Sequence, residues 1–226
     1  TLESRGLGDV YKRQGLGALE LCVIAEELGR VAAPVPFSSS VYLGTESIVQ
    51  YGTSDQKEKW LPKLASGEII STFALPETNS EPTEKNIKTI FSNGKINGKK
   101  IPFAYGSYAD IAIVVVKNVN NNEITLAISE LTSNNIVRKP ISTLDPSRDH
   151  AEIHFDNSEA EIMDTNNEGW GAVENIMNSA AVLMAFEQIG GAEASLNMAK
   201  NYALDRFAFG RQIGSYQAIK HKLADM

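Results

Sequence analysis

The hydrophobic residues change their spacing twice along this chain of 226 residues, and no other feature limits its fold as strongly. In the first and last parts they recur every three or four residues, as in amphipathic helices. Between these parts they alternate with a period of two, which is typical of half-buried strands. The sequence therefore predicts an α+β multidomain fold. An N-terminal helical domain covers 15–67, a middle antiparallel β-barrel or sandwich covers 68–160, and a C-terminal helical bundle starts within 161–226.

The N-terminal zone contains three predicted helices. The segment LGALELCVIAEELGRV (16–31) repeats apolar side chains at three-residue steps, among them Cys22 and Ala25. A second helix is predicted over 39–51. A third, short helix follows, with Ser54 as its N-cap.

Both ends of the sequence lack the signals of a natural terminus. Residues 1–14 have no clear period, and we expect them to be a scar or a disordered segment. At the other end, the helical spacing continues to Met226 without a Gly, Asn or Pro stop signal. We therefore expect the last helix to be longer in the parent protein.

Six short apolar runs in the middle zone predict strands. They are IISTFAL, KTIFSN, KKIPFAY, IAIVVVK, EITLAISE and HAEIHF. Asn93-Gly94, Asn97-Gly98 and the stretch NVNNN (118–122) are predicted turns, because Asn and Gly tolerate a positive φ.

A polar linker, 156–170, precedes a long predicted helix that begins near Gly171. This helix contains the pair Gly190-Gly191, and each glycine costs about 1 kcal/mol in a helix interior. We expect the close approach of another helix backbone to offset that cost.

Composition excludes several classes of function. The net charge of −7 argues against broad binding to nucleic acid or anionic membranes. Cys22 is the only cysteine, which excludes an internal disulfide and fits a reducing compartment. No uncharged apolar run approaches the roughly 20 residues of a membrane span, and no signal peptide is visible. The resulting expectation is a cytoplasmic location.

Two segments of the middle zone have the residues of a ligand site. The loop FALPETN (73–79) leaves a strand with backbone groups that can meet a planar polar ligand, although a Pro turn closing a strand looks the same. In 97–110, Phe103, Tyr105 and Tyr108 stand close together in the sequence. They either flank a flat ring or cover a half-buried hairpin.

The segment 201–226 carries a group of basic side chains: Arg206, Arg211, Lys220, His221 and Lys222. Bases at a helix C-terminus interact favourably with the helix dipole, which is one explanation. The other is a phosphate site, formed by the Arg206 guanidinium, a glycine turn and the N-terminus of a helix that starts near Ser215.

His150, Glu152 and His154 alternate along one predicted strand and therefore share a face. Neighbours of this kind lie about 6–7 Å apart, which is too far to share one ion easily at bonds of about 2.1 Å. We interpret them as a solvated sheet face and predict no metal site.

The order of these signals resembles the acyl-CoA dehydrogenase family over about residues 15–226. The helical zone ends in YGTSDQKEKWLPKLASGEIISTFALPE, the β zone opens with NGKK and closes near HFDNSEAEIM, and YALDRFAFGRQIGSYQAIKHKLADM follows. The most specific part is R-x-x-F-G-R-x-I-x-x-x-Q-A-I-K-H, residues 206–221. The resemblance implies FAD as the cofactor. It also implies that Arg206, Phe209 and Gln217 reach across a subunit interface to the FAD of a neighbouring chain.

The resemblance places the other half of the cofactor site on the β domain, at Leu75, Pro76, Phe103 and Ala104. In the family, a threonine in the strand-exit loop touches the flavin through its hydroxyl and backbone. Pro76 stands there and lacks both the hydroxyl and a backbone donor. A second family element, Trp-Ile-Thr/Ser, corresponds to Pro102-Phe103-Ala104 in this chain. The aromatic residue is therefore one position later, and the hydroxyl residue is replaced by alanine. We expect contacts through the backbone of Leu75 and Phe103.

The activity implied by the resemblance is α,β-dehydrogenation of an acyl-CoA thioester, with electrons passed to an electron-transfer flavoprotein. A carboxylate removes the α proton while the flavin takes a hydride from the β carbon. In most members that glutamate lies beyond the position of Met226, so no catalytic residue is predicted. A minority place it on the first long helix beside an arginine, at about Ala180-Ala181, where neither residue occurs. The nearest carboxylates, Glu174 and Glu187, are expected to face solvent.

Two other interpretations stay open. The hydroxyls absent at Pro76 and Ala104, and the acid or base absent at Ala181, suit a non-catalytic, FAD-contacting subunit of a heteromeric acyl-CoA dehydrogenase. The sequence leaves open whether the oligomer is homomeric or heteromeric. From a different class, the chain is a cofactor-free α+β interaction protein whose basic cluster is a solvated helix end.

Overall fold

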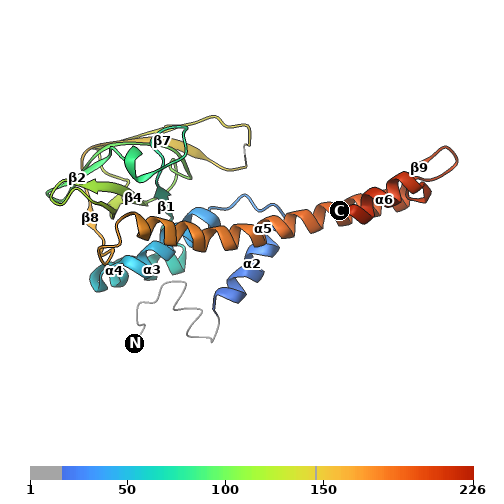
Figure 1. Cartoon of the computed structure of the whole chain (residues 1–226), viewed down its shortest axis with the longest axis horizontal. Coiled ribbons are helices and arrows are strands. Elements are labelled where there is room, and N and C mark those ends of the chain that lie inside the picture. The colour runs from blue at the N-terminus through green and yellow to red at the C-terminus, as the bar shows by residue number, and fades with distance from the viewer. Residues whose placement is uncertain (1–16, 146) are drawn as a thin grey trace. The chain divides into compact units, whose positions relative to one another are not determined.

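The computed structural model describes residues 17–145 and 147–226, and the predicted terminal segment 1–14 lies outside them. Helices occupy both ends of the described chain and a sheet occupies its middle (Figure 1). The helices are α2 (Ala18–Arg30), η1 (Ser38–Thr45), α3 (Glu46–Tyr51), α4 (Ser54–Ser66), η2 (Glu84–Asn86), α5 (Trp170–Asp205), η3 (Ile213–Ser215) and α6 (Gln217–Asp225). The strands are β1 (Ser71–Ala74), β2 (Ile90–Ser92), β3 (Lys95–Ala104), β4 (Ile111–Asn118), β5 (Ile124–Glu130), β6 (Ile136–Pro140), β7 (His150–Glu159), β8 (Glu161–Ile162), β9 (Phe207–Ala208) and β10 (Arg211–Gln212). The helix–sheet–helix order predicted from the hydrophobic spacing is confirmed.

The described residues divide into two compact units. The first contains Gly17 and Pro34–Ala181, which include the sheet and the helices from η1 to α4. The second contains Ala18–Ala33 and Val182–Met226, which include α2, β9, β10 and α6. Helix α5, orange in Figure 1, supplies its first part to one unit and the remainder to the other.

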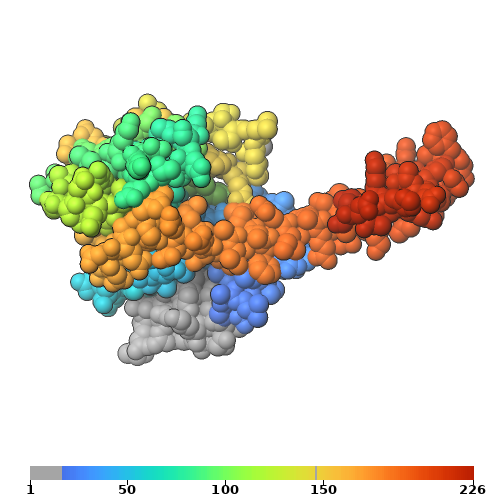
Figure 2. Space-filling model, in the orientation of Figure 1, coloured from blue at the N-terminus to red at the C-terminus, as the bar shows by residue number. Residues whose placement is uncertain are grey.

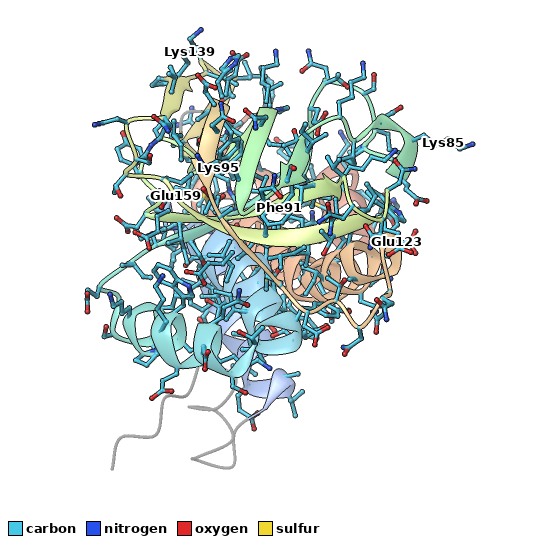
Figure 3. The ribbon with its side chains drawn as sticks, turned by 90° about the vertical axis from the view of Figure 1, so that its left-hand side faces the viewer. Lys85, Phe91, Lys95, Glu123, Lys139 and Glu159 are labelled. Carbon is cyan, nitrogen blue, oxygen red and sulfur yellow. The ribbon has the colours of Figure 1, made fainter. Side chains whose placement is uncertain are left out.

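Strands β1 to β8 form one mixed, curled sheet, which can be followed in Figure 3. Strand β4 pairs with β5 in the antiparallel direction, as do β3 with β2 and with β7. The antiparallel prediction is therefore right for most pairs. However, β1 and β2 run parallel to β4. Neither is joined to β4 by a tight turn, because other elements lie between them in the sequence, and such longer connections allow parallel pairing. Figure 3 labels Lys95 and Glu159, the first residues paired between β3 and β7.

The side chains of β4 are buried on both faces of the sheet. Ile111, Ile113 and Val115 belong to a core that also contains Trp60 of α4 and Ile176 of α5. The alternate residues belong to a second core on the other face; they are Ala112, Val114 and Val116. Burial on both faces explains why this strand reads as a continuous apolar run, because strand side chains alternate between faces.

Helix α4 begins with a capping box. The Thr53 hydroxyl accepts a hydrogen bond from Gln56 N at 3.3 Å, and the Gln56 side chain accepts one from Thr53 N at 3.0 Å. The predicted cap, Ser54, is wrong: it is the first residue inside the helix. A glutamine three residues after Thr53, but not after Ser54, decides between the two hydroxyl residues.

Two of the three predicted turns are confirmed. Asn93 and Gly94, with φ of 50° and 75°, form the two-residue loop between β2 and β3, and the NVNNN stretch joins β4 to β5. Gly98 instead lies inside β3, where the register against β7 shifts, so the turn predicted at Asn97-Gly98 is wrong. A Cβ on Gly98 would lie 2.7 Å from Thr89 Cα, so this glycine permits a close backbone approach.

Glycines let α2 and the second part of α5 approach each other closely. A Cβ on Gly190 would lie 1.9 Å from the carbonyl oxygen of Glu26. In the reverse direction, a Cβ on Gly29 would lie 1.7 Å from the carbonyl oxygen of Glu187. The close helix approach predicted for the glycine pair is therefore confirmed, and it is reciprocal.

Replacing Gly190 by Ala would force a methyl group into the Glu26 carbonyl. We expect the free energy of unfolding to fall by about 2 kcal/mol or more, the cost of overpacking, although Ala favours a helix by about 1 kcal/mol. Gly171→Ala in the same helix is the control, because its Cβ would meet only Glu168 Cβ at 3.9 Å. Urea unfolding measures both variants. Equal midpoints would contradict the close approach.

Replacing Thr53 by Ala would remove the cap of α4. We expect a loss of about 1 kcal/mol in the free energy of unfolding, because the Gln56 backbone N–H loses its acceptor. Ser54→Ala should change stability by less than about 0.5 kcal/mol, since that residue caps nothing. Urea unfolding of the two variants decides between the caps, and the opposite ranking would restore Ser54.

Candidate functional site

The exit of β1 lies against the end of β3. Ile101 N donates a hydrogen bond to Pro76 O at 2.8 Å. The Thr72 hydroxyl of β1 donates to Ala104 O at 2.5 Å. The structure thus brings together the two segments of the β domain that the sequence analysis assigned to the cofactor.

A buried ion pair lies at this junction. Lys100 Nζ is 2.8 Å from Glu77 Oε1 and 3.2 Å from Leu75 O. The side chain of Lys100 is 0% exposed and that of Glu77 is 9% exposed. The Glu77 carboxylate also accepts hydrogen bonds from Lys88 N at 2.8 Å and Thr89 N at 2.9 Å. One carboxylate therefore connects the exit of β1, the approach to β2 and the middle of β3.

The two charges of this pair compensate each other. Burial lowers the pKa of Lys100 to about 8, although Glu77 acts in the opposite direction. Burial alone would raise the pKa of Glu77, but the charge of Lys100 and hydrogen bonds from Lys100 and Thr89 lower it. The sequence analysis missed the pair. Ile96 and Lys100 are an even number of residues apart, which favours the same face for both, but β3 shifts register between them and alternation alone does not predict the pair.

The ring of Phe103 points into the second core. It is 3% exposed and belongs to the same cluster as Phe91 and Phe155. A Cβ on Gly106 would lie 2.6 Å from the Phe103 ring. Because alternate strand residues face opposite sides, moving the aromatic residue by one position transfers its ring to the other face. The interpretation in which this ring flanks a flat ligand is wrong, and only the backbone of Phe103 stays a candidate.

A hollow of about 400 Å³ follows the end of β3. Tyr105 and Tyr108 line one part of it, and the other lining residues are Pro34, Ile141, Ser142, Thr143, Ser147, Arg148 and Asp149. The Tyr105 hydroxyl donates to Val35 O at 3.0 Å. This hydrogen bond fixes the orientation of the ring at the wall of the hollow. The hollow combines a guanidinium with several hydroxyl groups beside the predicted cofactor segment.

A second hollow, of about 490 Å³, lies beside Trp60 of α4. It contains Lys59, whose ammonium pairs with Glu161 at 2.7 Å and with Glu130 at 3.3 Å. None of the residues predicted to contact the cofactor lines this hollow. Lys95 and Glu159 also line it.

Phe209 stands at the tip of a short hairpin in the second unit. The hairpin joins β9 to β10, and its strands of two residues each are too short to give a sequence signal. Phe209 and Gly210 form the loop, with φ of 54° and 80°. A positive φ is unusual for a bulky residue, and Phe209 is 96% exposed. The contacts described for this unit give no reason for a strained aromatic residue in water.

Arg206 and Gln217 flank this hairpin, and both are exposed. Gln217 is the first residue of α6, so the helix begins slightly later than the predicted start near Ser215. Tyr216 connects the helix start to the hairpin: its hydroxyl donates to the hairpin backbone at 2.9 Å, and the Arg211 guanidinium lies 4.0 Å from its ring centre. In Figure 2 the hairpin and α6 (red) are uncovered on the face shown. The segment thus exposes a guanidinium, an amide and an aromatic ring.

The first part of α5 carries no acid or base at the position that the resemblance indicates. Ala180 is buried and Ala181 is exposed. Glu174 is exposed as expected. Glu187 is half-buried rather than solvent-facing, because Gly29 of α2 lies against its backbone.

The alternating polar residues of β7 make local contacts. His154 and Glu152 are hydrogen-bonded, Lys99 Nζ lies 3.6 Å from Glu152, and His150 Nδ1 lies 3.1 Å from Arg148 O. Among the residues that the structure describes, no group of three or more His, Cys, Asp or Glu side chains is arranged to hold a metal ion. Within 17–145 and 147–226, no helix has both the length and the apolar character needed to cross a bilayer.

Comparison with known proteins matches both helical zones to one family. Residues 8–68 match the model "Acyl-CoA dehydrogenase, N-terminal domain", and residues 167–226 match "Acyl-CoA dehydrogenase, C-terminal domain". An acyl-CoA dehydrogenase of Bacillus subtilis (strain 168) is 33% identical over 230 residues, which cover 96% of this chain and 61% of that protein.

Solved structures agree with the sequence matches. Butyryl-CoA dehydrogenase from Megasphaera elsdenii matches with a TM-score of 0.87 and 26% identity, over 95% of this chain and 60% of that one. A glutaryl-CoA dehydrogenase from Mycobacterium smegmatis in complex with FADH2 matches with a TM-score of 0.74 and 25% identity, over 83% of this chain and 50% of that one. The chain therefore spans about half to three-fifths of the length of these relatives. Its sequence matches and its helix–sheet–helix structure together place the chain in the acyl-CoA dehydrogenase family.

Proposed function

We propose that the protein containing this chain is a flavoenzyme that dehydrogenates an acyl-CoA thioester between its α and β carbons. Family membership supports the reaction class, and the FADH2 complex of a relative supports the cofactor. The observation that carries the proposal is the exposed, left-handed Phe209 between Arg206 and Gln217. A cofactor-free interaction protein gives this arrangement no specific role. The proposal includes transfer of electrons to an electron-transfer flavoprotein and the cytoplasmic location expected from composition.

The exposed residues of the second unit fit the FAD of a neighbouring chain. The guanidinium of Arg206 and the amide of Gln217 are donors for a pyrophosphate, and the N-terminus of α6 adds a favourable dipole. The Phe209 ring offers an apolar surface that loses contact with water when a dinucleotide covers it. These groups are exposed among the described residues, and we propose that a neighbouring subunit completes the site. An oligomer is therefore part of the proposal.

The β domain would receive the flavin ring through backbone groups. Leu75 and Phe103 supply backbone atoms, whereas Pro76 has no N–H, and Ala104 O already accepts from Thr72 at 2.5 Å. When bound, FAD would supply the hydride acceptor of the reaction. This chain's residues bind and orient it, and none of the described carboxylates is assigned as the base that removes the α proton.

The hollow beyond β3 suits the polar part of an acyl-CoA. Its serine and threonine hydroxyls can bind polar groups, and it is also lined by Asp149 and by Arg148, whose guanidinium donates to the Ser38 hydroxyl at 3.2 Å. It begins at Tyr105, the residue that follows the segment assigned to the flavin. We therefore assign it to the substrate, because it adjoins the segment assigned to the flavin, whereas the hollow beside Trp60 does not.

A non-catalytic subunit that contacts FAD is the second candidate. The absent donor at Pro76 and the missing acid at Ala180-Ala181 favour it. So does the Phe103 ring, which is buried in the core. In this case the residues from Arg206 to Gln217 serve the active site of a partner subunit.

Replacing Phe209 by Ala tests the cofactor assignment. In the native protein, expressed at its natural length, we expect the FAD dissociation constant to rise about tenfold, the effect of one lost aromatic contact. Phe207→Ala is the control, because this 62% exposed phenylalanine of the same hairpin lies at a variable position of the signature. Titration with FAD, followed by flavin fluorescence, measures both variants. Wild-type protein without flavin, or equal affinities for the two variants, would contradict the assignment.

Anaerobic addition of an acyl-CoA separates the two candidate functions. A catalytic subunit should bleach the visible absorbance of its flavin, because the hydride moves from the β carbon to the bound cofactor. A supporting subunit, purified without its partner, should stay yellow. Bleaching by this protein in the absence of any other subunit would therefore exclude the second candidate.

A further inference from the structure

Strand β3 places an ammonium group where core side chains belong. Its buried residues are Ile96, Lys100 and Phe103, and the first and last of these belong to the second core. Replacing a buried ion pair by apolar residues is often neutral or stabilising, because removing two charges from water costs so much. Stability alone therefore does not explain why Lys100 and Glu77 occupy this position.

The geometry of the pair indicates what it controls. Lys100 Nζ binds Leu75 O at 3.2 Å and Glu77 Oε1 at 2.8 Å, on either side of Pro76. Between them, Pro76 O accepts from Ile101 N at 2.8 Å. Three successive residues of the β1 exit are thus held by two successive residues of β3. Pro76 has no side-chain donor or backbone N–H of its own, so these contacts hold the exit through its neighbours and its carbonyl.

We propose that Lys100, paired with Glu77, is a positioning residue for the flavin. It holds the backbone of 75–76 in one arrangement relative to the backbone of 103–104. This inference rests on the proposed function, which assigns both segments to the flavin. Lys100 itself does not touch the cofactor, because its side chain has no exposed surface.

The test uses a double variant, Lys100→Met with Glu77→Gln, in the native protein at its natural length. Lys100→Met alone would leave the Glu77 carboxylate buried without its partner and would disturb folding. In the double variant, the single glutamine oxygen can accept from one of the backbone N–H groups of Lys88 and Thr89, which bond to different oxygens of Glu77. The matched control is Lys59→Met with Glu161→Gln, which removes a half-exposed pair of similar length, 2.7 Å, between α4 and β8.

We expect the double variant at Lys100 to bind FAD about tenfold more weakly or worse, the scale of one lost charge-assisted hydrogen bond. The absorption bands of the flavin that still binds should also shift, because its backbone partners move. The thermal midpoint of the flavin-free variant should stay within a few degrees of that of the control variant, and the control should keep wild-type affinity and spectrum.

An unchanged affinity and spectrum in the double variant would overturn the inference while leaving the proposed function intact. The inference would also be overturned if the double variant lost FAD affinity together with a large fall in its thermal midpoint. The ion pair would then stabilise the fold and have no separate effect on the flavin site. Wild-type protein that binds no FAD would overturn the proposed function and this inference together.

Discussion

The contact between β3 and the exit of β1 is the interaction on which the candidate site depends. It includes one backbone hydrogen bond, from Ile101 to Pro76, and one buried ion pair, between Lys100 and Glu77. The ion pair is shielded from water, so a missing partner there would be costly. The two strand segments proposed to meet the flavin are therefore fixed relative to each other, and the Lys100 side chain that fixes them is itself buried.

The order of the zones was predictable because hydrophobic spacing reports which elements are buried on one side. Local signals were less reliable where two of them compete. Thr53 and Ser54 are both good caps, and only the later glutamine separates them. Asn97-Gly98 has the composition of a turn, but it lies inside β3, where Asn97 pairs with Ile90 of the preceding strand and Gly98 lies against Thr89. Parallel pairing of β1 with β4 has no local signal, since it depends on the path of the whole chain.

The candidate site was predictable to a different degree in its two halves. The motif at Arg206, Phe209 and Gln217 identified the exposed segment, although the strain and exposure of Phe209 needed coordinates. In the β domain, the resemblance indicated two strand ends that the structure brings into contact. It did not reveal that the one-residue shift at Phe103 buries the ring, or that Lys100 lies beneath the loop. Simple alternation cannot bury both Lys100 and Phe103, which are three residues apart; the register shift between them, seen only in the structure, makes it possible.

An experimental structure of the native protein with FAD tests the central claim most directly, because the claim concerns which chains share the cofactor. The account predicts the pyrophosphate beside Arg206 and Gln217 of one chain, and the flavin ring against 75–76 and 103–104 of its neighbour. FAD held within a single chain, with Arg206 and Gln217 in solvent, would contradict it.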